Sequence, residues 1–346
     1  MTALTLSSAG RKTLYRWQRA PLEDSLRALI PQWGDQPLSI ISEDLDSNAS
    51  FVNYVRHHRI IDPITGKTLE CVEKSIRKLA FVGSQEARFH RAEGMLEGSA
   101  HFHHPTCLGV IETPWESLIF TAFVRGKPPR MHAIARQLAQ GIAEQEQLSH
   151  DYLVAQPMQQ APLLWSMDFY RPWFLLRPRF NFERHLSHLE ALGREDVCFA
   201  GLAQRLKSFT PMLRGMAKQA RQSPRCISHM DYLRKNLFVV KNQLHVIDWS
   251  EAKVGRVGFD GGAYLGSLFR RKDMKVFIAA QAEFIETYRA VLSSKFDCDE
   301  ALRNLHYIFL LTALYHSLRP ETLAEYRERE RMPLLLQKYE YLLTLL

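Results

Sequence analysis

The chain has 346 residues, of which 46% are hydrophobic and 24% are charged, and this composition is typical of a globular protein of about two domains. No apolar run approaches the ~20 residues that a membrane-spanning helix requires, and the first residues lack the apolar core of a secretory signal, so we expect a cytoplasmic protein without a transmembrane segment. The formal net charge of +8 favours an anionic partner, but the basic residues form no arm, recognition motif or basic helix, and we expect no binding to nucleic acid.

The first part of the chain predicts an N-terminal extension followed by a small sheet-rich lobe. Residues 1–35 show helical spacing in their second half, which indicates a helical extension that either packs on the next lobe or mediates association. Residues 36–126 show short runs of alternating apolar residues separated by turn signals. The elements predicted in this lobe are strands over 38–45, 51–58 and 68–76, joined by antiparallel hairpins, a helix over 84–96, and strands over 107–112 and 117–124.

The pattern becomes helical after residue 126, so residues 127–346 are predicted to form a larger helical lobe. Apolar residues recur there at the spacing of one helix face. The predicted helices cover 131–148, 197–220, 273–292 and 300–318. Pro211 should kink or break the second of them, because its ring lacks a backbone donor and clashes with the preceding turn. The predicted fold class is α+β in two lobes.

One stretch of the helical lobe carries most of the chemistry. The sequence ISHMDYLRKNLFVV, residues 227–240, is followed by the turn KNQ and a second apolar run, LHVIDW, which together predict a tight hairpin. Asp231 and Asn236 precede its first strand and Asp248 ends its second, so all three are expected at one end, facing one cleft. Two carboxylates and an amide oxygen are hard ligands that suit Mg²⁺ better than a transition metal.

This stretch resembles the catalytic and metal-binding loops of the aminoglycoside phosphotransferase and choline kinase-like family, which is part of the protein-kinase-like superfamily. Its members commonly read H-G-D-x-x-x-x-N and then I-D-W-E or D-F-G. Here Met230 stands in place of the glycine and Ser250 in place of the glutamate. The resemblance implies a small antiparallel-sheet N-lobe that binds ATP and a larger helical C-lobe that carries the catalytic loop and the acceptor site.

The resemblance also implies roles for the three polar residues. Asp231 would orient the attacking hydroxyl and accept its proton, and Asn236 and Asp248 would hold Mg²⁺ on the nucleotide phosphates. Positioning and charge neutralisation would then supply most of the catalysis. The alternative is that Asp231 and Asn236 only cap a turn before a strand, as such residues commonly do.

A kinase-like N-lobe needs a lysine on its third strand, paired with a glutamate on the next helix, to hold the nucleotide phosphates. Lys74 lies on the third predicted strand and Glu86 on the predicted helix that follows. Strand alternation places Lys74 on the face opposite to Cys71. The alternative is a surface pair that matches by chance, since several other charged residues lie nearby.

Two more segments of the N-lobe are assigned to the nucleotide by the resemblance. The turn between the first two strands contains no glycine, and its Ser47, Asn48 and Ser50 either bind phosphate or form an ordinary hairpin turn. Further on, the sequence LIFTAFVRGKP resembles the hinge that binds adenine. The residues expected beside the adenine edge are Thr121, Ala122, Phe123 and Val124.

Other polar clusters are given structural roles. Asp260 matches the family aspartate that braces the catalytic loop from the start of a helix, and a plain helix N-cap is nearly the same prediction. The sequence HFHHPTC is interpreted as a turn rather than a metal site, because no matching ligand cluster occurs elsewhere. The five cysteines form no CxxC pair and predict neither a disulfide framework nor a zinc knuckle.

The acceptor is the least determined part of the prediction. Residues 163–186 lie where the family builds part of its acceptor site. This segment is dense in aromatic and arginine side chains. A polycationic aminoglycoside would instead need an acceptor site lined by carboxylates. An equally open interpretation is that these aromatics are core and the arginines a solvated face. We therefore expect a Mg²⁺-dependent, ATP-using kinase for a hydroxyl of an anionic or neutral small molecule or saccharide, including a lipid-linked sugar met at a membrane surface. The alternative is a catalytically silent scaffold that binds a protein partner.

Overall fold

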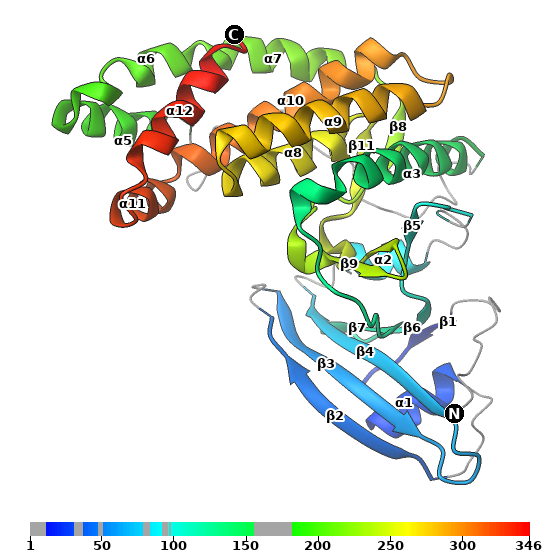
Figure 1. Cartoon of the computed structure of the whole chain (residues 1–346). Helices are drawn as coiled ribbons and strands as arrows, with labels where there is room; N and C mark the ends of the chain where they lie inside the picture. The colour runs from blue at the N-terminus through cyan, green and yellow to red at the C-terminus, as the bar shows by residue number, and fades with distance from the viewer. Residues whose placement is uncertain are drawn as a thin grey trace.

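The computed structural model describes residues 12–30, 37–47, 51–78, 84–91, 96, 98–155 and 182–346, and within them the chain forms two lobes (Figure 1). A sheet with two helices makes up the N-lobe, and helices dominate the C-lobe. This arrangement confirms the predicted two-lobed α+β architecture. Among the described residues, no helix combines the length and the apolar character that a membrane span requires.

The N-lobe is built on a six-stranded sheet with the strand order β1-β6-β7-β4-β3-β2. Neighbouring strands are antiparallel, except that β1 pairs parallel with β6. The hairpins that join the first three predicted strands are confirmed as β2, β3 and β4, whereas the short strand β1 was not predicted. The strands are β1 (Lys12–Tyr15), β2 (Ser39–Leu45), β3 (Val52–Ile61), β4 (Thr68–Arg77), β6 (Cys107–Glu112) and β7 (Glu116–Ala122).

Two helices cover opposite faces of this sheet. Helix α1 (Leu22–Leu29) packs with Cys71 and Phe120, so the N-terminal extension packs on the small lobe. Helix α2 (Gln85–Arg91) packs on the other face, where its Ala87 meets a cluster that includes Ile119 of β7. This helix was predicted over 84–96 and is described over 85–91 only. The opposite placement follows from the two-residue period of strands, which turns successive side chains to alternate faces.

A short antiparallel hairpin lies where the two lobes meet. Strand β9 (Leu237–Val240) pairs with β10 (Gln243–Val246), which confirms the hairpin predicted there. On its other side, β10 pairs parallel with β5 (Phe102–His103) from the N-lobe. The hairpin is therefore attached to both lobes through backbone hydrogen bonds.

The crossover from the N-lobe to the C-lobe is tied to the same hairpin. Lys127 N donates to the carbonyl of Val239 at 3.3 Å, and Val239 N donates back to the carbonyl of Lys127 at 2.9 Å. Gly126 approaches the hairpin so closely that an added Cβ would lie 2.9 Å from the Cβ of Phe238. A side chain at this position would therefore push the crossover away from the hairpin.

The C-lobe contains most of the helices and a two-stranded ribbon of β8 (Arg225–Ser228) and β11 (Lys253–Arg256). The region predicted as a helix over 197–220 with a kink or break at Pro211 is divided, which confirms the predicted break. The break falls at Ser208, so Pro211 sits in the first turn of the next helix, where its missing donor costs little. The helices are α3 (Ala135–Ala155), α5 (Phe182–Glu195), α6 (Leu202–Lys207), α7 (Phe209–Ala220), α8 (Phe259–Arg271), α9 (Met274–Val291), α10 (Cys298–Leu318), α11 (Pro320–Glu328) and α12 (Met332–Leu343).

Helix α8 begins in close contact with α10, and a glycine makes this contact possible. Gly258, the N-cap of α8, has a φ of 92°, and an added Cβ would lie 2.0 Å from the carbonyl oxygen of Ala301 in α10. Only glycine adopts this left-handed conformation without strain and leaves that space open. The start of α8, and with it Asp260, is thereby held at a fixed position next to the loop that carries Asp231.

A buried carboxyl lies next to this helix start. Glu146 of α3 is fully buried and accepts a hydrogen bond from Gly258 N at 2.8 Å and another from the hydroxyl of Tyr288. Burial raises the pKa of Glu146 from an ordinary 4.5 to about 8, and the negative charge of Asp260 adds to the rise. Glu146 is therefore protonated in the folded protein at neutral pH.

Replacing Glu146 by glutamine should flatten the pH dependence of stability. Between the ordinary pKa of 4.5 and about 8, the folded state holds a proton that the unfolded state releases. The free energy of unfolding should therefore fall as the pH rises through this window, by up to about 1.4 kcal/mol per pH unit. Glu146→Gln cannot ionise and keeps an oxygen for Gly258. Thermal midpoints measured across this window should fall more steeply for the wild type than for the variant, and parallel curves would contradict the assignment.

Candidate active site

A cleft of about 370 Å³ lies between the N-lobe sheet and the β9–β10 hairpin. The predicted site residues that line it are Ser47, Lys74, Glu86, Thr121, Ala122, Phe123, Val124, Asn236 and Asp248. Asp231 is not part of this lining and is joined to it through Asn236. Asn48, Ser50 and the aromatic and arginine-rich stretch up to residue 181 lie outside the described residues. The cleft thus brings together residues from both lobes that are far apart in sequence.

An ion-pair cluster forms part of the lining of the cleft. Lys74 Nζ lies 2.6 Å from Glu86 Oε2 and 2.6 Å from Asp248 Oδ1. The three residues come from β4, from α2 and from the end of the hairpin, so one lysine connects three separate elements. All three side chains are largely buried, with Lys74 13% exposed. Burial weakens the competition of water, which strengthens each of these contacts.

The pKa values in this cluster are shifted in different directions. Burial by itself would lower the pKa of Lys74, but the carboxylates of Glu86 and Asp248 outweigh it and hold that pKa above its ordinary value. Burial would raise the pKa of Asp248, but Lys74 outweighs it and lowers that pKa to about 2. Burial and the charge of Asp248 raise the pKa of Glu86. Asp248 is therefore the carboxylate of the cluster that stays ionised most firmly.

The loop that carries Asp231 is held from below by Asp260. The buried carboxylate of Asp260 accepts hydrogen bonds from His229 N at 3.0 Å and from Met230 N at 2.9 Å. It accepts a third from the hydroxyl of Tyr232 at 3.1 Å. The brace predicted for Asp260 is therefore confirmed. Met230 has a φ of 66°, a left-handed conformation that a glycine would adopt with less strain.

His229 orients the same loop from inside. Its ring is fully buried, Nδ1 accepts from Asp231 N at 3.2 Å, and Nε2 lies 3.0 Å from the carbonyl of Ile247. Because a carbonyl oxygen only accepts, Nε2 is the donor in this contact. His229 therefore connects the backbone before Asp231 to the backbone before Asp248.

Asp231 and Asn236 form a direct pair. Asn236 Nδ2 donates to Asp231 Oδ2 at 2.9 Å and to the carbonyl of Asp231 at 3.0 Å. With its amide nitrogen engaged on Asp231, the side-chain oxygen of Asn236 is left as an acceptor, and Asn236 lines the cleft. Burial raises the pKa of Asp231, although the hydrogen bond from Asn236 and the charge of Lys235 act in the opposite direction.

Several residues that line the cleft were missed by the sequence analysis. Val72 and Ile119 lie on the N-lobe side, and Phe238 and Ile247 lie on the C-lobe side, so the cleft has an apolar section between two walls. Strand alternation offered a signal for Val72, which shares a face with Lys74. Lys235 also lines the cleft and adds a positive charge beside Asn236. Its position directly before Asn236 in the motif was the available signal.

A comparison with models of protein families matches residues 115–304 to the phosphotransferase enzyme family. The matched region begins before β7 and ends within α10, so it contains the loop that carries Asp231, the β9–β10 hairpin and Asp260. A comparison with curated proteins finds no match.

Solved structures with a similar fold include a choline kinase from Cryptosporidium parvum Iowa II, with a TM-score of 0.56 and 12% identity over 94% of this chain and 97% of that chain. They also include the amicoumacin kinase hAmiN in complex with AMP-PNP, Ca²⁺ and Ami, with a TM-score of 0.54 and 11% identity over 87% of this chain and 88% of that chain. These similarities concern the fold, and they confirm the two-lobed kinase-like architecture.

Proposed function

Since the chain belongs to the phosphotransferase enzyme family, we propose that it transfers the γ-phosphate of ATP, with Mg²⁺, to a hydroxyl of a small molecule or saccharide. The observation that carries this proposal is the continuous set of polar residues from Lys74 through Asp248 and Asn236 to Asp231. Phosphate transfer needs a cation for the phosphates, oxygen ligands for a metal and a carboxylate for the attacking hydroxyl. Lys74, Asn236 and Asp248 in the cleft supply the first two, and Asp231, hydrogen-bonded to Asn236, supplies the third.

The inner part of the cleft suits an adenine ring. Val72, Ile119 and Ile247 offer apolar contact on both sides, and Thr121 to Val124 run along its edge. Phe123 N already donates to the carbonyl of Glu70 at 3.0 Å, whereas the structure gives Val124 N no hydrogen-bond partner among the described residues. We therefore assign Val124 N–H as the donor to the adenine edge. A planar ligand with an acceptor on its rim satisfies this amide without moving the strand.

The donor set fits Mg²⁺. The firmly ionised carboxylate of Asp248 and the side-chain oxygen of Asn236 both line the cleft, and Mg²⁺ is usually held by one or two such protein oxygens together with substrate phosphates. When bound there, the metal would neutralise charge on the phosphates. Lys74 contributes a second positive charge, and Glu86 holds that lysine in position from α2.

Asp231 is the residue that we assign to the acceptor hydroxyl. In the proposed step the acceptor oxygen forms a bond to the γ-phosphorus, the bond from that phosphorus to the bridging β-phosphate oxygen breaks, and the hydroxyl proton passes to the carboxylate of Asp231. The raised pKa of Asp231 makes it a better proton acceptor than an ordinary aspartate. The hydrogen bond from Asn236 holds this carboxylate next to the metal ligands. An anionic or neutral acceptor remains our expectation, in contrast to an aminoglycoside.

A transfer assay with labelled ATP tests the proposal. Wild-type protein with Mg²⁺ and γ-labelled ATP should label at least one member of a panel of hydroxyl-bearing acceptors, chosen from sugars, amino alcohols and lipid-linked saccharides. Lys74→Met should lower this transfer by about 10²-fold or more, because it removes a positive charge that we place on the phosphates. Lys67→Met, an exposed lysine in the turn between β3 and β4, is the matched control and should transfer normally.

Loss of Lys74 also leaves Glu86 and Asp248 without their shared cation, so folding must be followed by the thermal midpoint. Lys74→Arg keeps a cation between the two carboxylates and provides a folded comparison with altered geometry. Equal transfer by the wild type and by folded Lys74→Met would contradict the assignment. Nucleotide binding without any transfer would favour the silent scaffold.

A further inference from the structure

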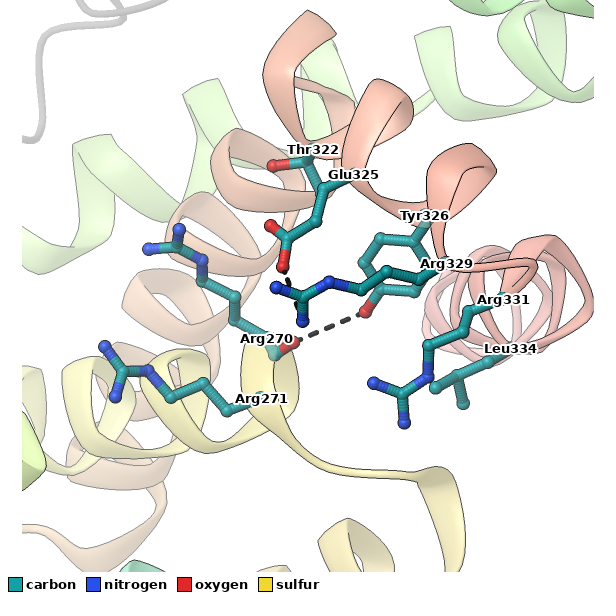
Figure 2. A pocket seen from close by; sticks show the side chains of 8 residues that line it. All are labelled: Arg270, Arg271, Thr322, Glu325, Tyr326, Arg329, Arg331 and Leu334. Carbon is teal, nitrogen blue, oxygen red and sulfur yellow. Dashed lines mark hydrogen bonds and ion pairs between the residues drawn. The ribbon is translucent and has the colours of Figure 1, made fainter.

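A second pocket lies in the C-lobe, away from the cleft. It has a volume of about 260 Å³ and lies between the C-terminal end of α8, helix α11 and the start of α12 (Figure 2). None of the residues that line it also lines the cleft. Its most prominent side chains are four arginines, two from the last turn of α8 and two from the turn that joins α11 to α12: Arg270, Arg271, Arg329 and Arg331.

The charges of this pocket are not balanced. Its one lining carboxylate, Glu325, lies 3.1 Å from Arg329 and neutralises that arginine. Within the described part of the chain, no carboxylate forms an ion pair with Arg270, Arg271 or Arg331. The nearby Asp273 is engaged as the N-cap of α9. Within the part of the chain that the structure describes, three guanidinium groups that line this pocket therefore have no ion-pair partner.

Groups buried beneath the pocket respond to this excess of positive charge. Lys338 is 2% exposed, and its Nζ donates to the carbonyl of Arg270 at 3.0 Å and to the hydroxyl of Tyr326 at 2.7 Å. Burial and, to a lesser extent, the charge of Arg331 lower the pKa of Lys338 to about 8, although Asp273 acts in the opposite direction. His316 is affected in the same way, because burial and then Arg270 lower its pKa to about 3. Burial is the larger cause of both shifts, and the arginines of the pocket add to it.

The backbone explains how arginines from distant segments converge. Arg270 and Arg271 end α8, where the helix dipole favours cations by itself. Arg329 is the C-cap of α11, so the same dipole argument applies to it. Arg331 follows in a turn where Glu330 has a φ of 55° and Arg331 N donates to the carbonyl of Tyr326 at 2.8 Å. This turn fixes the backbone on both sides of Glu330. The neighbouring Arg329 and Arg331 line the same pocket as the two arginines at the end of α8.

We propose that this pocket binds the phosphate or pyrophosphate group of an anionic molecule. Guanidinium groups present planar pairs of donors that match phosphate oxygens, and several of them in a small pocket favour a group with more than one negative charge. The hydroxyl of Thr322, which has no hydrogen-bond partner among the described residues, is a further donor in the lining. The volume suits a group of the size of pyrophosphate better than a whole nucleotide. This site does not depend on the proposed kinase activity.

Calorimetric titration with inorganic pyrophosphate tests this site directly. The titration is done in EDTA, which suppresses metal-dependent binding of pyrophosphate in the cleft. Any pyrophosphate that still binds in the cleft contributes equally to all variants, because none of them changes a residue of the cleft. Arg270→Gln/Arg271→Gln should weaken the binding by about tenfold or more. Arg327→Gln is the matched control, because Arg327 lies on α11 but pairs with Glu195 outside this pocket. It should bind as the wild type does.

A second pair of variants and a lipid arm complete the test. Arg329→Gln/Arg331→Gln removes the arginines of the other segment and should reproduce the loss, which protects against a folding defect of the first pair. Sedimentation with phosphatidic acid vesicles, compared with phosphatidylcholine vesicles, distinguishes a lipid headgroup from a free phosphorylated molecule. Arginine-dependent binding to pyrophosphate supports the free molecule, and arginine-dependent binding to phosphatidic acid alone supports the headgroup. The proposal is overturned if the wild type binds neither pyrophosphate nor phosphatidic acid. It is also overturned if both pairs of variants bind each of these ligands as the wild type does.

Discussion

Replacing Asp231 by asparagine should lower phosphate transfer by about 10²- to 10⁴-fold and leave nucleotide binding intact. The variant loses the only group that we assign to the hydroxyl proton. Asparagine has the same shape, and its side-chain oxygen can still accept the hydrogen bond that Asn236 donates. The loop should therefore keep its position on Asp260. Transfer is measured with γ-labelled ATP, both to the acceptor found by screening and to water, which serves as acceptor in the slow hydrolysis reaction.

The controls for Asp231→Asn separate chemistry from folding. Asp151→Asn removes a carboxylate of the same kind from an exposed ion pair with Lys295 and should leave transfer unchanged. The wild type should lose activity as the pH falls, because Asp231 must be ionised to accept a proton. Burial raises the pKa of Asp231, so this loss should begin at a higher pH than an ordinary aspartate would give. Full transfer by Asp231→Asn would show that another group handles the proton.

Replacing Asp248 by alanine should abolish the stabilisation of the protein by Mg²⁺ and ATP. A ligand at about 100 times its dissociation constant adds roughly 2.7 kcal/mol to the free energy of unfolding, and the wild-type thermal midpoint should rise by several degrees. Asp248→Ala removes a proposed metal ligand and one of the two partners of Lys74. Lys74 still has Glu86 at 2.6 Å, so the folded structure should survive. The measurement is the midpoint with and without Mg²⁺ and ATP.

Glu251→Ala is the matched control for Asp248→Ala. Glu251 lies three positions later and pairs with Lys253 at an exposed site, so its loss should leave the shift of the midpoint unchanged. A shift that disappears only in Asp248→Ala would support the metal and nucleotide site. A full shift in Asp248→Ala would remove this residue from the site, and no shift even in the wild type would favour the silent scaffold.

Local patterns predicted the elements that carry the proposed site. The two-residue period of β4 separates Lys74 from Cys71, and the structure has Lys74 in the cleft and Cys71 against α1. The β9–β10 hairpin followed from two apolar runs around a short polar turn. These features could be predicted because they depend on residues only a few positions apart.

The predicted strands and helix boundaries differ from the structure where contacts between distant segments override the local preference of the residues for helix or strand. Strand β1 has only four residues and is ordered by parallel pairing with β6, far along the chain. The break before Pro211 falls at Ser208, because a proline is tolerated in the first turn of a helix and not in its middle. Such boundaries depend on packing partners, which a periodic pattern does not reveal.

The sequence by itself determined the architecture and the kinds of residue in the proposed site. The alternation of apolar and polar residues, the turn residues and the motif around Asp231 each involve only a few consecutive positions. Only the tertiary structure decided which charges meet. Lys74 contacts Asp248 across 174 positions of sequence, and Arg270 shares a pocket with Arg331 although they belong to different helices and turns. Electrostatic interactions act over a few ångströms in space whatever the separation along the chain, so the ion-pair cluster and the arginine pocket exist only once the helices and lobes have packed.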